Sequence, residues 1–188
     1  MRWSDLVDPT REEVLAALPV QVDPEVVEIL ATLPSGGRDP RPVIEAHGAY
    51  VFGVLMAAHP LPDEDRIVYQ EVDFVATPSL LVTVRKTPTS RGVPTYPPVG
   101  PHPSLEAGAS GGALVHALVD DVADTYLSSI DEIYGEIEEL EDAIDSSPPS
   151  MVRERISSFR HELLDARRMM SATRAAVRKV VDGRVEVG

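Results

Sequence analysis

Two long helices predicted between residues 112 and 188 constrain the fold of this chain more than any other feature. From about Gly112 to Asp145, apolar residues recur every three or four positions and no proline intervenes, a pattern typical of a helix with one buried face. At about 1.5 Å per residue, such a helix is about 50 Å long, so it must project from the molecule or lie along a partner. The apolar positions are Leu118, Val122, Tyr126, Ile130, Ile133, Ile137, Leu140 and Ile144.

The second helix is predicted to pack against the first. Residues 146–150 contain two prolines and break the first pattern. The apolar residues that follow are spaced by alternating steps of four and three, as in a heptad repeat. We therefore predict an antiparallel hairpin with coiled-coil-like packing. The heptad positions are Val152, Ile156, Phe159, Leu163, Ala166, Met170, Thr173, Val177 and Val180.

Charge is distributed unequally between the two predicted helices. Between Asp120 and Asp145 there are 11 acidic residues and no basic one, whereas Met151 to Val181 contains eight Arg or Lys and three acidic residues. Ion pairs between the helices favour their association, each contributing ~0.2–1 kcal/mol when exposed. The remaining acidic excess needs a cation, a basic partner or water. The net charge of the whole chain, −14, argues against binding to nucleic acid.

The first 87 residues are predicted to form a mixed α/β unit. Thr10 followed by Glu13 has the spacing of a helix capping box, and Asp23 followed by Pro24 indicates the start of a second short helix. Three runs rich in apolar and β-branched residues predict strands, and the last two can form a hairpin. These runs span residues 50–56, 67–75 and 80–84.

A proline-rich segment separates this unit from the helices. Its prolines and glycines exclude a helix or a central strand. We therefore expect an α/β unit, a mixed sheet with flanking helices, at 1–87, a Pro/Gly-rich loop at 88–111 and the helical hairpin at 112–188. The chain has no cysteine, which excludes disulfides and thiolate metal sites. No apolar stretch reaches the roughly 20 residues that span a bilayer.

Signals of an enzyme are weak. Residues 108–112 match the Gly-x-Ser-x-Gly pattern of a serine-hydrolase elbow around Ser110, but that elbow requires a strand immediately upstream, where this chain has the proline-rich segment. The five histidines, at positions 47, 59, 102, 116 and 161, include no pair spaced to grip zinc on one helix face. We expect surface or packing roles for the histidines and no enzymatic activity.

Asp120, Asp121 and Asp124 are the candidate metal ligands. Asp120 and Asp124 share a helix face one turn apart, where like charges repel by a few tenths of a kcal/mol. Mg²⁺ or Ca²⁺, which prefer oxygen ligands, would relieve this repulsion by binding beside them. The spacing alone favours a solvated acidic face, or salt bridges to Arg174 and Arg178 on the partner helix, over an ion site.

The chain resembles the cytoplasmic domain of CorA-type magnesium transporters. Residues 3–6 and 9–13 are similar to the opening of that domain, and residues 41–42, 50–55 and 81–85 to its strands. The strongest match is the segment 117–126, which has the form A-L-x-D-x-x-x-D-x-Y that begins the long acidic helix of the family. The resemblance continues through residues 138–142 and 160–168.

The resemblance implies a homopentameric channel whose cytoplasmic domains bind Mg²⁺ between subunits and close the pore when the ion is plentiful. It implies that Asp120 is a sensor ligand, with Asp124 behind it, and that one partner carboxylate comes from a neighbouring subunit. The family's stalk helix, two membrane helices and Gly-Met-Asn signature are expected outside this chain, which contains no asparagine. We expect weak Mg²⁺ binding and no stable pentamer from this chain alone, at the cytoplasmic face of the cell membrane.

Two other functions remain open from the sequence. A zinc, cobalt or nickel transporter of the same superfamily would share this architecture and move a different ion. A freestanding coiled-coil adaptor would use the hairpin to dock a basic partner, and its stability would not respond to divalent cations.

Overall fold

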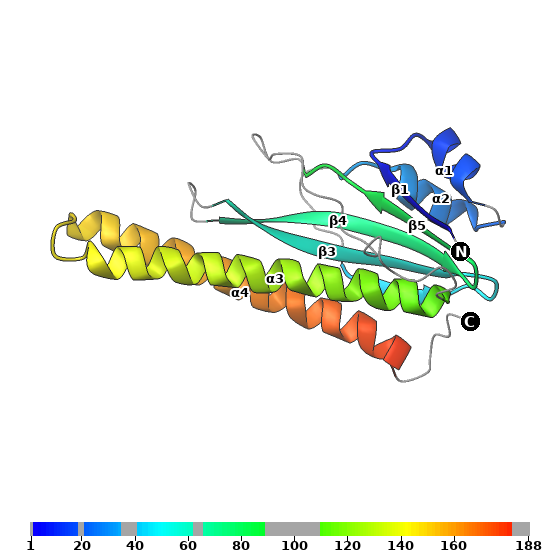
Figure 1. Cartoon of the computed structure of the whole chain (residues 1–188). Coiled ribbons are helices and arrows are strands. Elements are labelled where there is room, and N and C mark those ends of the chain that lie inside the picture. Colours follow the sequence, from blue (N-terminus) through cyan, green and yellow to red (C-terminus); the bar gives the residue numbers. More distant parts are fainter. Residues whose placement is uncertain (1, 19–20, 35–40, 62–65, 89–109, 182–188) are drawn as a thin grey trace.

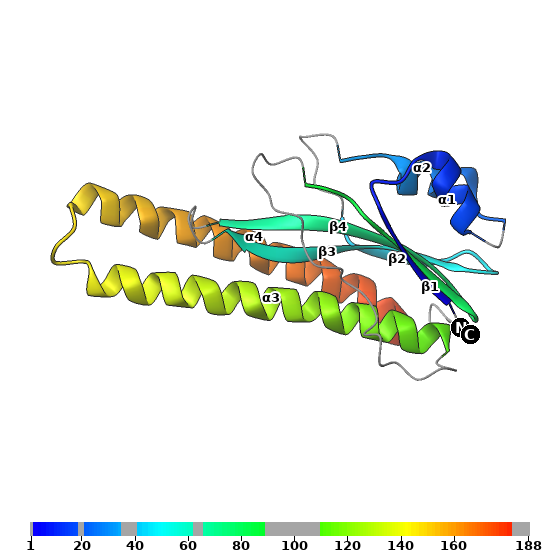
Figure 2. The same cartoon turned by 45° about the horizontal axis from the view of Figure 1, so that its top comes forward.

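A five-stranded sheet lies between two pairs of helices in the computed structural model (Figure 1), which describes residues 2–18, 21–34, 41–61, 66–88 and 110–181. Helices α1 and α2 cover one face of the sheet, and the long helices α3 and α4 cover the other (Figure 2). The elements are β1 (Arg2–Val7), α1 (Arg11–Ala17), α2 (Pro24–Ala31), β2 (Val43–Ala46), β3 (Val51–Leu61), β4 (Arg66–Thr77), β5 (Leu80–Arg85), α3 (Gly111–Asp142) and α4 (Pro149–Val181).

The sheet confirms the predicted strands and adds two at its edges. Its order is β1-β5-β4-β3-β2, with β1 parallel to β5 and every other pair antiparallel. The β4–β5 pair is the predicted hairpin, with Thr77 opposite Leu80 across the turn. The edge strands β1 and β2 were not predicted from the sequence because they are short and only partly buried.

Local capping determines how the two short helices begin. The predicted capping box of α1 is confirmed: the Thr10 Oγ1 accepts from the Glu13 amide at 3.3 Å, and the Glu13 carboxylate accepts from the Thr10 amide at 2.8 Å. Pro24 occupies the first turn of α2, as predicted. Asp23 precedes it but makes no side-chain capping bond. Its carboxylate instead accepts from the Tyr50 hydroxyl at 3.0 Å, which links α2 to the sheet.

The sheet is buried on both faces. Toward α1 and α2, Val82 of β5 packs with Val27 and Leu30. Toward α3 and α4, Phe74 of β4 packs in a second cluster that includes Leu118. This double coverage explains why β3, β4 and β5 are almost continuously buried, so that their sequences are apolar runs more than alternating patterns.

The two predicted long helices are confirmed, with 32 residues in α3 and 33 in α4. The turn that joins them lies far beyond the ends of the strands (Figure 1). The hairpin therefore projects from the α/β layers, as its predicted length required. Among the described residues, no helix is long and apolar enough to cross a membrane.

The predicted heptad of the second helix is correct at only some of its positions. Val152, Phe159 and Ala166 are buried, as predicted. Ile156 and Leu163 keep 52% and 40% of their surface exposed. Both side chains line an open groove near the α3–α4 turn together with Val152 and Phe159, so this end of the predicted apolar stripe is only partly covered.

Most of the segment predicted as a Pro/Gly-rich loop, and His102 within it, lies outside the described residues. Ser110, near the end of the predicted loop, is described and directly precedes α3. Its Oγ accepts from the Ala113 amide at 3.2 Å and so caps the start of α3. The structure therefore places Ser110 in a helix cap.

Candidate metal-responsive site on helix α3

The three candidate ligands lie in the part of α3 that packs beside the sheet. Thr125 fixes the rotation of the helix because its Oγ1 accepts from the Ala58 amide of β3 at 2.9 Å. Val122 and Tyr126 are buried on the same inner side. As a result Asp120 and Asp124 are exposed on the outer side of α3.

Asp120 lies beside a histidine of the same helix. The Nδ1 of His116 lies 3.1 Å from a carboxylate oxygen of Asp120, one helical turn away, and both side chains are largely exposed at 77% and 68%. Asp121 is half-buried. Exposed carboxylates of this kind can hold a hydrated Mg²⁺, which keeps several waters and takes only one or two protein carboxylates.

Within the parts of the chain that the structure covers, no three or more His, Asp or Glu side chains converge to hold a metal ion. Asp120, Asp121 and Asp124 therefore do not form a closed ligand set in one chain. Metal binding by these residues stays a prediction.

A buried ionic cluster on the other side of the sheet was not predicted from the sequence. The Lys86 Nζ lies 2.5 Å from a Glu71 oxygen and 2.8 Å from an Asp73 oxygen, and all three side chains are at most 7% exposed. The ammonium also donates to the Ile29 carbonyl of α2 at 2.8 Å. The cluster thus ties α2 to β4, and its only sequence signal is two acids spaced by two within an apolar strand.

Burial controls the protonation of this cluster. It raises the pKa of Asp73 well above the ordinary value, against the opposing effect of Lys86. Burial alone would lower the pKa of Lys86, but the two carboxylates outweigh it and raise that pKa. Both shifts favour retaining protons, because two carboxylates face one ammonium in a low-dielectric interior.

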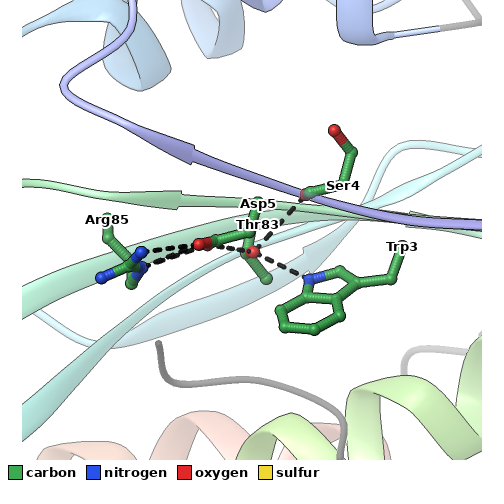
Figure 3. A network of polar contacts seen from close by, with 5 residues as sticks. All are labelled: Trp3, Ser4, Asp5, Thr83 and Arg85. Carbon is green, nitrogen blue, oxygen red and sulfur yellow. Dashed lines mark hydrogen bonds and ion pairs between the residues drawn. The ribbon is translucent and has the colours of Figure 1, made fainter. Parts of the chain in front are cut away.

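A second polar network joins the edge strand β1 to β5 (Figure 3). The Asp5 carboxylate accepts from the Arg85 guanidinium, with the shortest contact at 2.7 Å, and from the Thr83 hydroxyl at 2.8 Å. The Trp3 indole donates to the same hydroxyl at 2.9 Å. These bonds hold β1 in register with β5 and satisfy groups that the strand pairing buries.

The histidines within the described residues have local roles, as expected. His47 lies 2.8 Å from the Asp23 carboxylate, and this contact, followed by the Tyr50 hydroxyl bond, lowers the pKa of Asp23. His59 is buried, and burial lowers its pKa to about 4, so the ring is neutral at physiological pH. The Nδ1 of His161 lies 2.7 Å from the Ser157 carbonyl of α4.

Comparison with known proteins supports the resemblance over almost the whole chain. A family model described as CorA-like Mg²⁺ transporter protein matches residues 1–185. The complete CorA magnesium transporter from Methanocaldococcus jannaschii is similar in structure, with a TM-score of 0.68, 18% identity and coverage of 95% of this chain and 54% of that chain. This chain therefore spans about half the length of that protein. No curated protein sequence matches the chain.

Two separately solved domains are also similar. The soluble domain of CorA from the same archaeon gives a TM-score of 0.64 at 16% identity, covering 94% of this chain and 68% of that chain. The cytoplasmic domain of ZntB from Vibrio parahaemolyticus gives 0.62 at 14% identity, covering 98% and 70%.

The mixed sheet with its projecting helical hairpin defines the class: this is the fold of the soluble domain of CorA-type metal transporters. The chain belongs to the CorA-like Mg²⁺ transporter family.

Proposed function

We propose that this chain is the regulatory domain of a CorA-like divalent-cation channel and that it senses Mg²⁺ through the acidic outer side of α3. The observation that carries the proposal is the family match over residues 1–185 together with the exposure of Asp120 and Asp124. On this proposal the domain acts at the cytoplasmic face of a membrane, and it has no catalytic step.

An ion shared between copies is the simplest arrangement compatible with these residues. Because one chain brings no closed ligand set together among its described residues, an ion beside Asp120 would need further oxygen ligands from water or from a neighbouring copy. In the proposed homopentamer, Mg²⁺ would bridge carboxylates of adjacent domains. Loss of the ion would restore their repulsion and shift the assembly toward a looser, open state.

Calorimetric titration of the full chain with Mg²⁺, in the millimolar range, tests the site. The Asp120→Asn/Asp124→Asn variant is expected to lose the weak binding seen in the wild type. The matched control is Glu132→Gln/Glu139→Gln, which removes the same charge from exposed positions of α3 and is expected to retain it. An equal loss of Mg²⁺ binding in both variants would indicate only a diffuse attraction of the ion to the acidic helix, and would contradict the proposed binding site.

A zinc-transporting function is the second candidate, and one observation favours it. The pair formed by His116 and Asp120 combines a nitrogen and an oxygen ligand, which zinc accepts readily and Mg²⁺ does not. Replacement of His116 by Gln is expected to leave Mg²⁺ binding unchanged if the first proposal is correct. A selective loss of Zn²⁺ binding, with Zn²⁺ bound more tightly than Mg²⁺ by the wild type, would favour the second.

A further inference from the structure

The buried ionic cluster of Lys86, Glu71 and Asp73 holds the C-terminal end of α2 on the sheet. The Lys86 Nζ donates to a Glu71 oxygen at 2.5 Å and to the Ile29 carbonyl of α2 at 2.8 Å, and it lies 2.8 Å from an Asp73 oxygen. The last turn of α2 contains no basic residue of its own. Lys86, which directly follows β5, therefore supplies the positive charge that stabilises the C-terminus of a helix.

The cluster contains two acidic groups and one basic group. All three side chains are at most 7% exposed, so little water reaches them. Asp73 is fully buried, and neither of its carboxylate oxygens has a hydrogen bond of good geometry within the described part of the chain. Glu71, in contrast, accepts directly from Lys86. Because a buried carboxylate without hydrogen bonds is very unfavourable when ionised, Asp73 is the member of the cluster that keeps a proton.

No further charge balances the cluster among the described residues. Burial is the first cause of the raised pKa of Asp73, and Lys86 and Glu71 are the charged groups that act on it. In β3, the residues opposite Glu71 and Asp73 are Met56 and Val54, which carry no charge. The charged side chains of the covering helices are exposed: Arg11, Glu12 and Glu13 of α1, and Glu25 and Glu28 of α2.

Charged groups at the edge of the sheet are bonded elsewhere. The Asp5 carboxylate of β1 pairs with Arg85 at 2.7 Å, and the Asp8 carboxylate accepts from the Thr87 amide at 2.8 Å. The cluster is therefore electrically neutral only while one proton remains on its two acids.

Helix α2 is small, and its position depends on a few contacts. It has eight residues, and a helix of this length is not stable on its own in water. Val26, Val27 and Leu30 pack in the core between α2 and the sheet. At the start of the helix, the Asp23 carboxylate accepts from the Tyr50 hydroxyl at 3.0 Å. An ionisable group thus lies at each end of α2.

We propose that the buried cluster is a proton-operated latch: while Asp73 keeps its proton, Lys86 holds α2 on the sheet, and loss of that proton releases α2. Deprotonation leaves two carboxylates with one ammonium in a site without water, which is unfavourable until water is admitted. Helix α2 contributes a backbone carbonyl to the cluster and covers it. Water therefore reaches the two acids when α2 moves away from the sheet.

The two ends of α2 respond to pH in opposite directions. The His47 contact, followed by the Tyr50 hydroxyl bond, lowers the pKa of Asp23, so this end is weakened only as the pH falls below the ordinary value of 3.8. The Asp73 end is weakened as the pH rises above the same value. The latch can therefore be tested above about pH 5, where Asp23 stays ionised.

Thiol labelling of a single added cysteine tests the proposal, since the wild-type chain has no cysteine. Val27→Cys reports when α2 leaves the sheet, because Val27 is 2% exposed between them. Val122→Cys, at a position of α3 that is 1% exposed, is the matched control in the other core. Labelling rates are measured from about pH 5 to about pH 8 and divided by the rate of the same variant unfolded in urea, which removes the pH dependence of the thiol itself.

The latch predicts a local opening that releases one proton. Such an opening becomes up to about tenfold more frequent per pH unit between the ordinary and the raised pKa of Asp73. We expect Val27→Cys to be labelled at least about tenfold faster than Val122→Cys, since local opening is easier than global unfolding, and its rate to rise with pH. Asp73→Asn has no proton to release and is expected to abolish this rise, whereas Asp131→Asn in α3 is expected to leave it unchanged.

Three outcomes would overturn the inference. Equal labelling of the two cysteines would show that α2 opens only when the whole chain unfolds. Faster labelling of Val27→Cys at a rate that does not change with pH would show that its opening is not linked to a proton. A rise with pH that persists in Asp73→Asn would assign the proton to another group. The first two comparisons do not require the Asp73 variant to fold, and none of them involves Mg²⁺, so they are independent of the proposed metal site.

Discussion

The two halves of this molecule treat charge in opposite ways. Around the sheet, ionic groups are buried in contact with groups of opposite charge, as in the contact of Lys86 with Glu71 and Asp73. In the projecting hairpin, acids and arginines are exposed on separate helices, while apolar side chains such as Ile156 lie open to solvent. Buried charges fix one arrangement of the chain, whereas exposed and segregated charges determine which molecules can approach it.

The largest expected effect concerns the buried cluster. Lys86→Met leaves two carboxylates in an apolar site without their cation, and we expect a loss of about 3–5 kcal/mol in the free energy of unfolding. Urea denaturation measures this loss. Lys179, the only other lysine of the sequence, is half-buried in the last turn of α4, and Lys179→Met is expected to change stability by less than about 0.5 kcal/mol. Similar values for both variants would remove the contrast between the two halves.

A matched pair of glycine substitutions gives the next largest effect. A Cβ at Gly53 of β3 would collide with the buried ring of Phe74, whereas a Cβ at Gly135 of α3 would meet no other atom. We expect Gly53→Ala to destabilise the chain by about 1–3 kcal/mol through overpacking. Gly135→Ala is expected to stabilise it by about 0.5–1 kcal/mol, because alanine favours the helix. Thermal unfolding followed by calorimetry shows whether each variant is more or less stable than the wild type. A loss of stability in both variants would contradict the expectation for Gly135 in α3.

The pH dependence of stability separates the halves further. The pKa of Asp73 is raised in the folded chain above the ordinary value of 3.8. Between these two pKa values, the folded chain keeps the proton on Asp73, whereas the unfolded chain has released it. The contribution of Asp73 to the free energy of unfolding therefore falls as the pH rises from 3.8 toward the raised pKa. Asp73→Asn is expected to remove this decline, seen as a smaller difference between urea midpoints at about pH 5 and about pH 8. Asp131→Asn in the hairpin is the control, and a change of equal size there would contradict the assignment to the cluster.

The smallest expected effect is that of the partly exposed ion pair within the hairpin. Arg155 bonds to Glu136 at 2.8 Å and lies 5.3 Å from the centre of the Phe159 ring. We expect Arg155→Gln to cost about 0.2–1 kcal/mol. Urea denaturation of both proteins measures this cost. At about 1 M salt the difference in the free energy of unfolding between wild type and variant should be smaller, since salt screens such pairs. A loss as large as that of Lys86→Met would mean that the hairpin is held by charge as firmly as the sheet is.

Features encoded by neighbouring residues could be predicted from the sequence. The capping box at Thr10, the long helices and the three inner strands all follow from spacings within a few residues. The edge strand β1 could not, because its burial depends on pairing with β5 about eighty residues later. The same reason explains why Lys86 was not linked to Glu71 and Asp73.

The hairpin shows how periodicity alone misleads. The heptad prediction treated Phe159 and Leu163 alike, but Phe159 is buried whereas Leu163 keeps 40% of its surface exposed. Which positions of the apolar stripe are buried depends on where the rest of the chain packs, and that is a tertiary contact. For the candidate site, the sequence predicted the positions of Asp120 and Asp124 on one helix face, but the ligands needed to complete a metal site are not encoded in their spacing.

The parallel pairing of β1 with β5 has a consequence for how the protein is made. During synthesis the first strand emerges from the ribosome long before Leu80–Arg85, the one strand that pairs with it among the described residues. Its partner is therefore missing while α1, α2, β2, β3 and β4 are still being translated, and strand contacts of such long range form slowly. Until then Trp3 has no strand to pack against and stays accessible to chaperones. The change in its fluorescence reports when β1 pairs with β5 and the sheet is complete.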